Sequence, residues 1–144
     1  LRKPPKLLPV AQKPITRHIA IVCDGRGVDA PLDYAIETCT NQCNRLDILI
    51  HGAMDTRKIT AMEKRIQHVG LKSQRIHLGT GGVQHLIDYI RHQSSLLFLI
   101  ASPNDSVAKA LMDIFATRGN QHMNVPLVLI ENRSTANMAT ESAA

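Results

Sequence analysis

Several polar residues that could hold a small ligand directly follow apolar runs in this 144-residue chain. A carboxylate at Asp24 and an imidazole at His51 end the first two runs, and hydroxyl and amide side chains follow the fourth. The candidate ligand-binding residues are Asp24, Gly25, Gly27, His51, Ser102, Asn104 and Ser106. The sequence leaves two interpretations of Asp24 open. Its carboxylate could hold an adenine or ribose group, or it could cap the turn that follows.

The glycines after the first run match a dinucleotide fingerprint only in part. Gly25, Gly27 and Ala30 fit G-x-G-x-x-A, a spacing that lets a pyrophosphate approach the backbone at a helix N-terminus. Pro31 follows at once, and His51 stands where an acid for the ribose is needed. A tight turn with positive φ explains both glycines without a ligand. We therefore expect no dinucleotide here.

The loop after the fourth run favours helix capping over phosphate binding. Asn104 and Ser106 are suitable N-caps for the following helix. Asp105 lies between them and would repel a phosphate, and no glycine opens the turn. Capping is therefore the role that we predict for Asn104 and Ser106.

The chain lacks the sequence patterns of common catalytic and metal sites. No serine lies in G-x-S-x-G, and no Gly-Lys-Ser/Thr of a P-loop occurs. Cys39 and Cys43 share one helix face and could bind a soft metal with His51 or His77. Both cysteines belong to an apolar stripe, however, and buried cysteine behaves as a small hydrophobic residue. We predict no catalytic residue, no metal site and no enzymatic activity.

Five strands that alternate with helical patterns must position these residues. The predicted strands are residues 18–24, 46–53, 74–80, 95–102 and 125–131. Between them, apolar residues recur at helical spacing. This alternation predicts a three-layer α/β fold, with a parallel sheet covered by helices on both faces. Such sheets bind ligands beyond the carboxyl ends of their strands, and Asp24 and His51 stand at such ends.

The two ends of the chain differ from this central part. Residues 1–16 hold four of the seven prolines and several basic residues, which predicts an extended basic linker. Residues 132–144 predict a disordered tail. The domain itself is assigned to residues 17–131. Residues 18–144 balance 12 basic against 12 acidic residues, so the net charge of +5 comes from the first 17 residues. This neutral body and an aromatic content of 3% argue against nucleic-acid binding.

The composition also predicts where the domain works. Three cysteines, an odd number, indicate reduced thiols rather than a disulfide framework. No apolar run approaches the roughly 20 residues that span a bilayer. We expect a cytoplasmic domain that the basic linker could tether to another domain or to a membrane protein. The chain begins with Leu1, which fits a piece of a longer protein.

From about Arg17 to Glu131 the chain resembles the universal stress protein family. The resemblance rests on an apolar first strand that ends in Asp24-Gly25, on the second strand ending at His51, and on a final strand that opens with Val125-Pro126. It implies the fold of the adenine nucleotide alpha hydrolase-like proteins, with a five-stranded parallel sheet of order 3-2-1-4-5. It also implies a homodimer that pairs through the last strand, at Val125, Leu127 and Leu129.

The resemblance implies a regulatory module rather than an enzyme. Family members that bind ATP carry Gly-x-x-Gly after strand four and a later Gly-Ser or Gly-Thr, and this chain has Ser102-Pro103-Asn104-Asp105-Ser106 instead. Asp24 matches the aspartate that these members place beside adenosine. The first hypothesis is therefore a module without an ATP cofactor, which acts through dimerisation and through a partner or small ligand. The alternative is a stress-response sensor that binds ATP or AMP.

Overall fold

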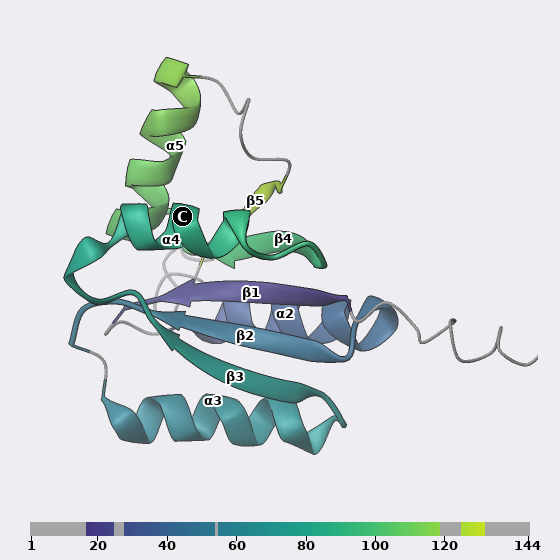
Figure 1. Ribbon diagram of the computed structural model, residues 1–144. Coiled ribbons are helices and arrows are strands. Elements are labelled where there is room, and N and C mark those ends of the chain that lie inside the picture. Colours follow the sequence, from purple (N-terminus) through teal and green to yellow (C-terminus); the bar gives the residue numbers. More distant parts are fainter. Residues whose placement is uncertain (1–16, 25–27, 54, 119–124, 132–144) are drawn as a thin grey trace, which may run out of the picture.

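A computed structural model describes residues 17–24, 28–53, 55–118 and 125–131. Strands and helices alternate along the chain, as the sequence predicts (Figure 1). In chain order the elements are β1 (His18–Cys23), α2 (Asp29–Gln42), β2 (Arg45–Ile50), α3 (Thr56–His68), β3 (Lys72–His77), the 3₁₀ turn η1 (Gly79–Gly81), α4 (Val83–Arg91), β4 (Leu96–Ala101), α5 (Ser106–Arg118) and β5 (Leu127–Leu129).

The five strands form one parallel sheet in the order β3-β2-β1-β4-β5. This confirms the predicted fold class and strand order. The chain first adds strands on one side of β1 and then crosses to its other side with β4. The topological switch point therefore lies between β1 and β4, where sheets of this kind bind ligands.

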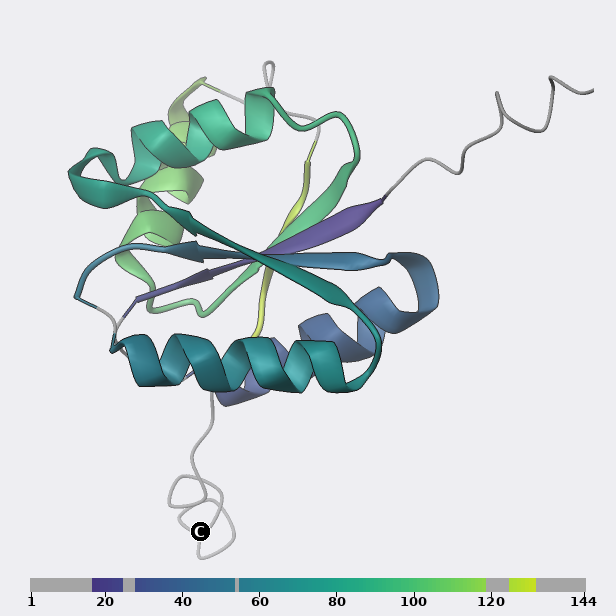
Figure 2. The same cartoon turned by 60° about the horizontal axis from the view of Figure 1, so that its bottom comes forward.

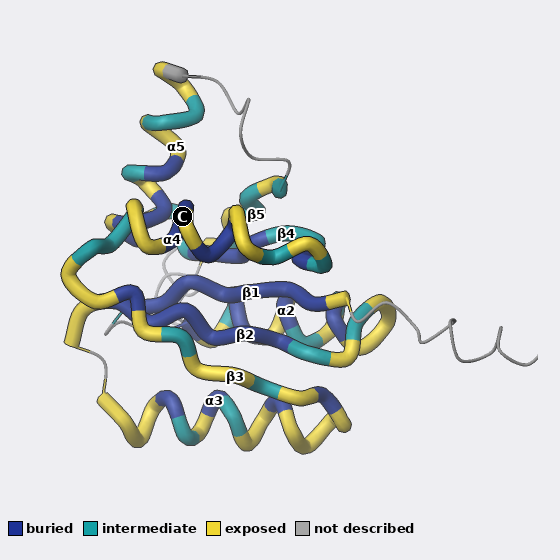
Figure 3. The backbone as a smooth tube through the Cα atoms, in the orientation of Figure 1, coloured by how far each residue is buried: buried dark blue, intermediate teal, exposed yellow. Residues whose placement is uncertain are grey.

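Helices cover both faces of the sheet, with α2 and α3 on one side and α4 and α5 on the other (Figure 2). Alternate residues of β1 serve the two cores: Ile19 and Ile21 face α2 and α3, whereas Ala20 and Val22 face α4 and α5. The central strands β1 and β2 are almost wholly buried, while β3 at the edge is mostly exposed (Figure 3). Because aromatic residues are scarce, aliphatic side chains fill both cores.

Local sequence signals set several helix ends as expected. The Asp55 carboxylate accepts a hydrogen bond from the Arg57 amide at 2.9 Å and so caps α3. Gly70 follows the end of α3 with a φ of 86°, a conformation that favours glycine. Pro31 lies in the first turn of α2. Backbone N–H groups in a first turn have no acceptor within the helix, so proline costs no hydrogen bond there.

The observed strands differ from the predicted ranges at the two edges of the sheet. β3 spans Lys72–His77, so it begins and ends closer to the N-terminus of the chain than the predicted range of 74–80. β5 keeps only Leu127–Leu129 of the predicted 125–131. Pro126 has no N–H to donate, and an edge strand has a neighbour on one side only, so little holds the ends of β5 in the ladder.

The predicted linker at 1–16 and tail at 132–144 lie outside the described residues, as do Gly25 and Gly27. Within the described part of the chain, no helix has the length and apolar character to cross a membrane.

Candidate functional site

The carboxyl ends of β1 and β2 bring Asp24 and His51 together. β1 and β2 pair in register up to Cys23 and Ile50, so Asp24 and His51 are the next residues on the two adjacent strands. The His51 amide continues this pairing by donating to the Cys23 carbonyl at 3.0 Å. Strand alternation turns both side chains toward the face that α4 and α5 cover. The sequence prediction that these two residues share one edge of the sheet agrees with this placement.

A second acidic group, Asp105, reaches the same point from the start of α5. Asp105 is buried, and its Oδ1 accepts a hydrogen bond from the Ala108 amide at 2.9 Å. Its backbone carbonyl also accepts the first helical bond, from the Lys109 amide at 2.9 Å. Asp105 is therefore the N-cap of α5. The predicted caps Asn104 and Ser106 are wrong, because the turn after β4 sets the cap position at the residue between them.

The second oxygen of Asp105 holds the histidine. His51 Nε2 lies 2.7 Å from Asp105 Oδ2, and both side chains are buried, with 8% and 3% of their surface exposed. A carboxylate only accepts hydrogen bonds, so Nε2 carries the proton and donates it. One atom from each of Asp24, His51 and Asp105 lies within 4.8 Å of the other two. We call these three residues the carboxyl-edge cluster.

The cluster is electrostatically negative. Two carboxyl groups stand beside one histidine, so acidic groups are the majority in the cluster. The neighbouring thiol responds to this charge: burial, followed by the charges of Asp105 and Asp24, raises the pKa of Cys23 to about 12. Asp24 is only partly buried and connects the cluster to solvent. The arrangement can therefore accept hydrogen bonds and bind positive charge, while it disfavours a bare phosphate.

The other described ligand candidates, Ser102, Asn104 and Ser106, lie between β4 and the start of α5. Ser102 shapes the turn after β4: its Oγ accepts from the Asn104 amide at 3.3 Å, and its carbonyl accepts from the Asp105 amide at 3.0 Å. Ser106 is the exposed first residue of α5. Gly52 follows His51 with a φ of 76°, and a Cβ there would stand 3.8 Å from Asp24 Cβ. This glycine turns the chain away immediately beyond the cluster.

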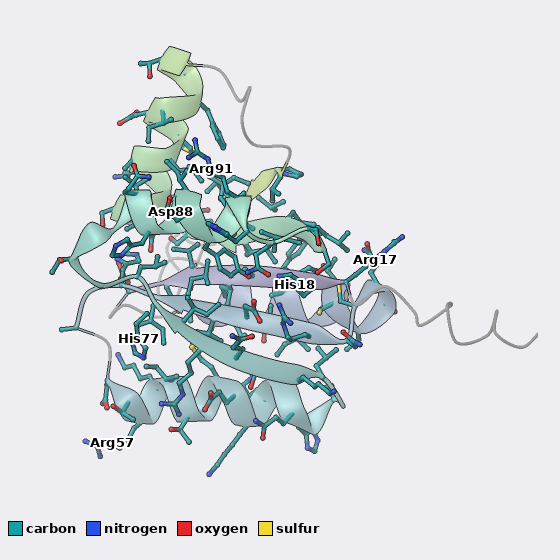
Figure 4. The ribbon with its side chains drawn as sticks, in the orientation of Figure 1. Arg17, His18, Arg57, His77, Asp88 and Arg91 are labelled. Atoms are coloured by element: carbon teal, nitrogen blue, oxygen red, sulfur yellow. The ribbon has the colours of Figure 1, made fainter. Side chains whose placement is uncertain are left out.

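The amino ends of the same strands carry a second polar group, which the sequence reasoning missed. His18 and Asp47 are fully buried on the face that α4 and α5 cover, and Figure 4 labels His18 beside Arg17 at the start of β1. Tyr89 of α4 donates to Asp47 Oδ2 at 2.6 Å, and Arg45 Nε donates to Asp47 Oδ1 at 2.8 Å. The signal available was an aspartate inside an apolar strand, because a buried carboxylate requires partners. We call His18, Arg45, Asp47, Tyr89 and Ser95 the amino-edge network.

The hydrogen bonds of the amino-edge network run in one direction. Since the Tyr89 hydroxyl gives its proton to Asp47, its oxygen accepts from His18 Nε2, which lies 3.1 Å away. His18 Nδ1 then accepts from Ser95 Oγ at 3.1 Å. This assigns a neutral His18, and it agrees with the pKa of His18, which burial and then the charge of Arg45 lower. Every polar side chain of the network has a partner, so the network is a structural device.

The cysteines lie away from the carboxyl-edge histidine. Cys39 is buried in the core, and its thiol donates to the Arg45 carbonyl at the amino end of β2, whereas His51 follows the carboxyl end. Burial raises the pKa of Cys39 to about 12 and also raises that of Cys43. All three cysteines are free thiols. The four-residue spacing of Cys39 and Cys43 therefore serves the core and forms no site with His51.

Comparisons with known proteins support the fold of this chain. No protein-family model matches this chain, and no curated protein matches its sequence. Its structure is similar to that of a universal stress protein from Archaeoglobus fulgidus, with a TM-score of 0.61 and 15% sequence identity over 85% of this chain and 98% of that one. At this identity the likeness establishes a shared fold, the one that the sequence resemblance implied.

Proposed function

We propose that this chain is a regulatory module of the universal stress protein type that binds a small ligand at the carboxyl-edge cluster. The observation that carries the proposal is the convergence of Asp24, His51 and Asp105 at the topological switch point of the sheet. The similarity to a universal stress protein supports the type of module.

The chemistry of the cluster favours a ligand other than ATP. Asp24 and Asp105 place negative charge where ATP would bring more. A small molecule that donates hydrogen bonds or carries positive charge complements these acceptors. In this proposal the module carries out no reaction of its own and passes the bound state to a partner protein in the cytoplasm.

Thermal unfolding in the presence of candidate ligands tests the proposal. A ligand that binds only the native state stabilises it by about 2.7 kcal/mol at a hundredfold excess over Kd. We expect no shift in Tm with ATP, ADP, AMP, cyclic nucleotides or NAD at millimolar concentration. We expect a shift with at least one member of a panel of amines, guanidines and neutral hydrogen-bond donors. Asp24→Asn should abolish that shift, and a panel without any Asp24-dependent shift would contradict the proposal.

The alternative function is an adenine-nucleotide sensor. Asp24 favours it, because this residue follows β1 beside the switch point and matches the aspartate that nucleotide-binding family members place beside adenosine. A Tm shift with ATP or AMP that Asp24→Asn abolishes would select this alternative. A nucleotide shift that persists in Asp24→Asn would point to a different surface and support neither function.

Dimerisation through β5 is part of the proposal. β5 is an edge strand whose described residues pair with β4 on one side, and Leu129 is exposed. Val125 and Leu127 pack against the core beneath α4 and α5, so the backbone edge and Leu129 remain for a second copy. Leu129→Lys should shift the chain from dimer to monomer in sedimentation equilibrium. Met112→Lys, on the exposed face of α5, is the matched control and should leave the dimer intact.

A further inference from the structure

The geometry points to a divalent transition-metal site at the carboxyl-edge cluster, and we propose that Asp24, His51 and Asp105 each donate one ligand atom to the ion. This inference rests on the proposed ligand site and names the ligand class. The three donor atoms already lie within 4.8 Å of one another. They come from three separate elements, since Asp24 follows β1, His51 follows β2 and Asp105 caps α5.

The spacing of the donors suits a metal after a small adjustment. In a tetrahedral zinc site with bonds of about 2.0–2.1 Å, the donor atoms stand about 3.3 Å apart. The His51 Nε2 to Asp105 Oδ2 distance of 2.7 Å is shorter than this value, and the 4.8 Å limit on the other pairs is longer. Binding through Nε2 would therefore exchange one hydrogen bond for two metal bonds, and the proton on Nε2 would move to Nδ1 or be released to solvent. Asp105 keeps its second oxygen on the Ala108 amide, which holds the carboxylate in place.

The histidine is buried, and one of its ring nitrogens is already held at the proposed site. His51 is more than nine-tenths buried, and its Nε2 is bound to Asp105. Among the residues that the structure describes, none makes a hydrogen bond with the other ring nitrogen, Nδ1. The same is not true of His18, whose two ring nitrogens both have partners.

The donor types select the class of metal. Imidazole suits zinc and its neighbours in the first transition row, whereas carboxylates suit these ions and harder ones. One imidazole with two carboxylates therefore favours Zn²⁺, Co²⁺ or Mn²⁺ over Mg²⁺ and Ca²⁺, which take all-oxygen sites. Three protein ligands leave a position open for a further ligand. A bound divalent cation would also offset the negative charge of the two carboxylates.

Calorimetric titration of the full chain with Zn²⁺ tests the inference, with Mg²⁺ as the comparison ion. We expect one Zn²⁺ per chain, and much weaker binding of Mg²⁺. Loss of an outer-shell partner typically costs about 10–100-fold in metal affinity, so loss of a ligand in Asp24→Asn or His51→Gln should cost at least that much. Asp88→Asn, an exposed acid on α4, is the matched control and should bind as the parent does.

Cobalt spectroscopy separates this site from the thiols. Co²⁺ bound by Asp24, His51 and Asp105 should show visible d–d bands without a thiolate charge-transfer band in the near ultraviolet. A thiolate band, equal binding of Mg²⁺, or full Zn²⁺ affinity in both Asp24→Asn and His51→Gln would overturn the inference. These results leave the proposed function separately testable, because an Asp24-dependent shift with an organic ligand in metal-free buffer would support that function even if Zn²⁺ does not bind.

Discussion

The two ends of β1 and β2 use the same residue types on the same face of the sheet for different purposes. At the amino end, β1 provides His18 and β2 provides Asp47; at the carboxyl end, β1 leads to Asp24 and β2 to His51. Apolar residues separate the two groups along each strand. The residue types alone therefore do not decide which group is structural.

The difference lies in what covers each end. Tyr89 of α4 and Arg45 complete the amino-edge network, where each donor has an acceptor and the Arg45 charge balances that of Asp47. The carboxyl-edge cluster holds two carboxyl groups beside one histidine, and Asp24 is only partly buried. A closed network stabilises the fold, whereas an acidic cluster that reaches the surface can bind a ligand. Four predictions test this contrast.

The largest effect is expected from opening the amino-edge network. Asp47→Ala leaves Arg45 and the buried Tyr89 hydroxyl without their acceptor, and breaking a buried pair in this way costs about 3 kcal/mol. Urea denaturation should show this loss in the free energy of unfolding. Asp88→Ala, an exposed acid on α4, should change stability by no more than about 0.5 kcal/mol. Equal effects of the two variants would contradict the structural role of the network.

At the carboxyl edge, Asp105 is the one residue with a structural duty as well as a site role. Asp105→Ala removes the N-cap of α5 and the partner of buried His51, and should cost about 2 kcal/mol. Asp105→Ser restores a capping oxygen but not the carboxylate, so about 1 kcal/mol of stability should return. Denaturant midpoints of the two variants measure the difference. If serine recovers nothing, the cap assignment is wrong.

Acid should weaken the amino-edge network through His18. Its pKa is lowered in the folded state, because burial and then the charge of Arg45 disfavour the imidazolium, while the Asp47 charge favours it less strongly. The unfolded chain then binds the proton more readily, so this contribution to stability is full above about pH 6.5 and falls as the pH drops toward the folded pKa. Tyr89 does not titrate in this window, since burial and the Asp47 hydrogen bond raise its pKa.

The pH dependence is measured as the free energy of unfolding between pH 7.5 and 5. His18→Gln should flatten the decline, because glutamine has no proton to gain. His68→Gln, at an exposed histidine of α3, is the control and should leave the slope unchanged. A steeper decline in His18→Gln would mean that His18 is protonated in the native state, contrary to its hydrogen bonds.

The smallest effect on stability is expected at Asp24. Its side chain is partly exposed and stands at the edge of the cluster, so Asp24→Asn should change the free energy of unfolding by no more than about 0.5 kcal/mol. The same substitution should remove ligand binding. Thermal unfolding with and without ligand measures both quantities on one sample. A large loss of stability would mean that Asp24 has a structural role, as the amino-edge network does. The two ends of the strands would then not differ in function.

The sequence predicted the layers and the alternation of strands and helices better than it predicted the site. Alternating apolar runs and helical stripes identified every element of the sheet, and Asp24 and His51 followed from the rule that ligands gather at strand carboxyl ends. Asp105 was missed because three consecutive polar residues, Asn104, Asp105 and Ser106, all suit an N-cap. The exact turn after β4 chooses among them, and no local propensity sets that turn.

The amino-edge network was missed for a different reason. His18 and Asp47 lie within apolar strands, and Tyr89 is distant in sequence, so only the packing of α4 on the sheet brings them together. The short β5 has a similar cause, since the apolar pattern continues past the point where pairing with β4 ends. Local patterns record propensity, while tertiary neighbours decide which polar groups find partners.

The most direct test of the account is a map of amide chemical shifts as ¹⁵N-labelled protein is titrated with the small-molecule panel and with Zn²⁺. The account predicts that binding moves the amides of Asp24, His51, Gly52 and Ala108 at the carboxyl edge. The amides of Arg45, Tyr89 and Ser95 at the amino edge should stay in place. Shifts confined to the amino edge, or no shifts with any ligand, would contradict the claim that the carboxyl-edge cluster is the binding site.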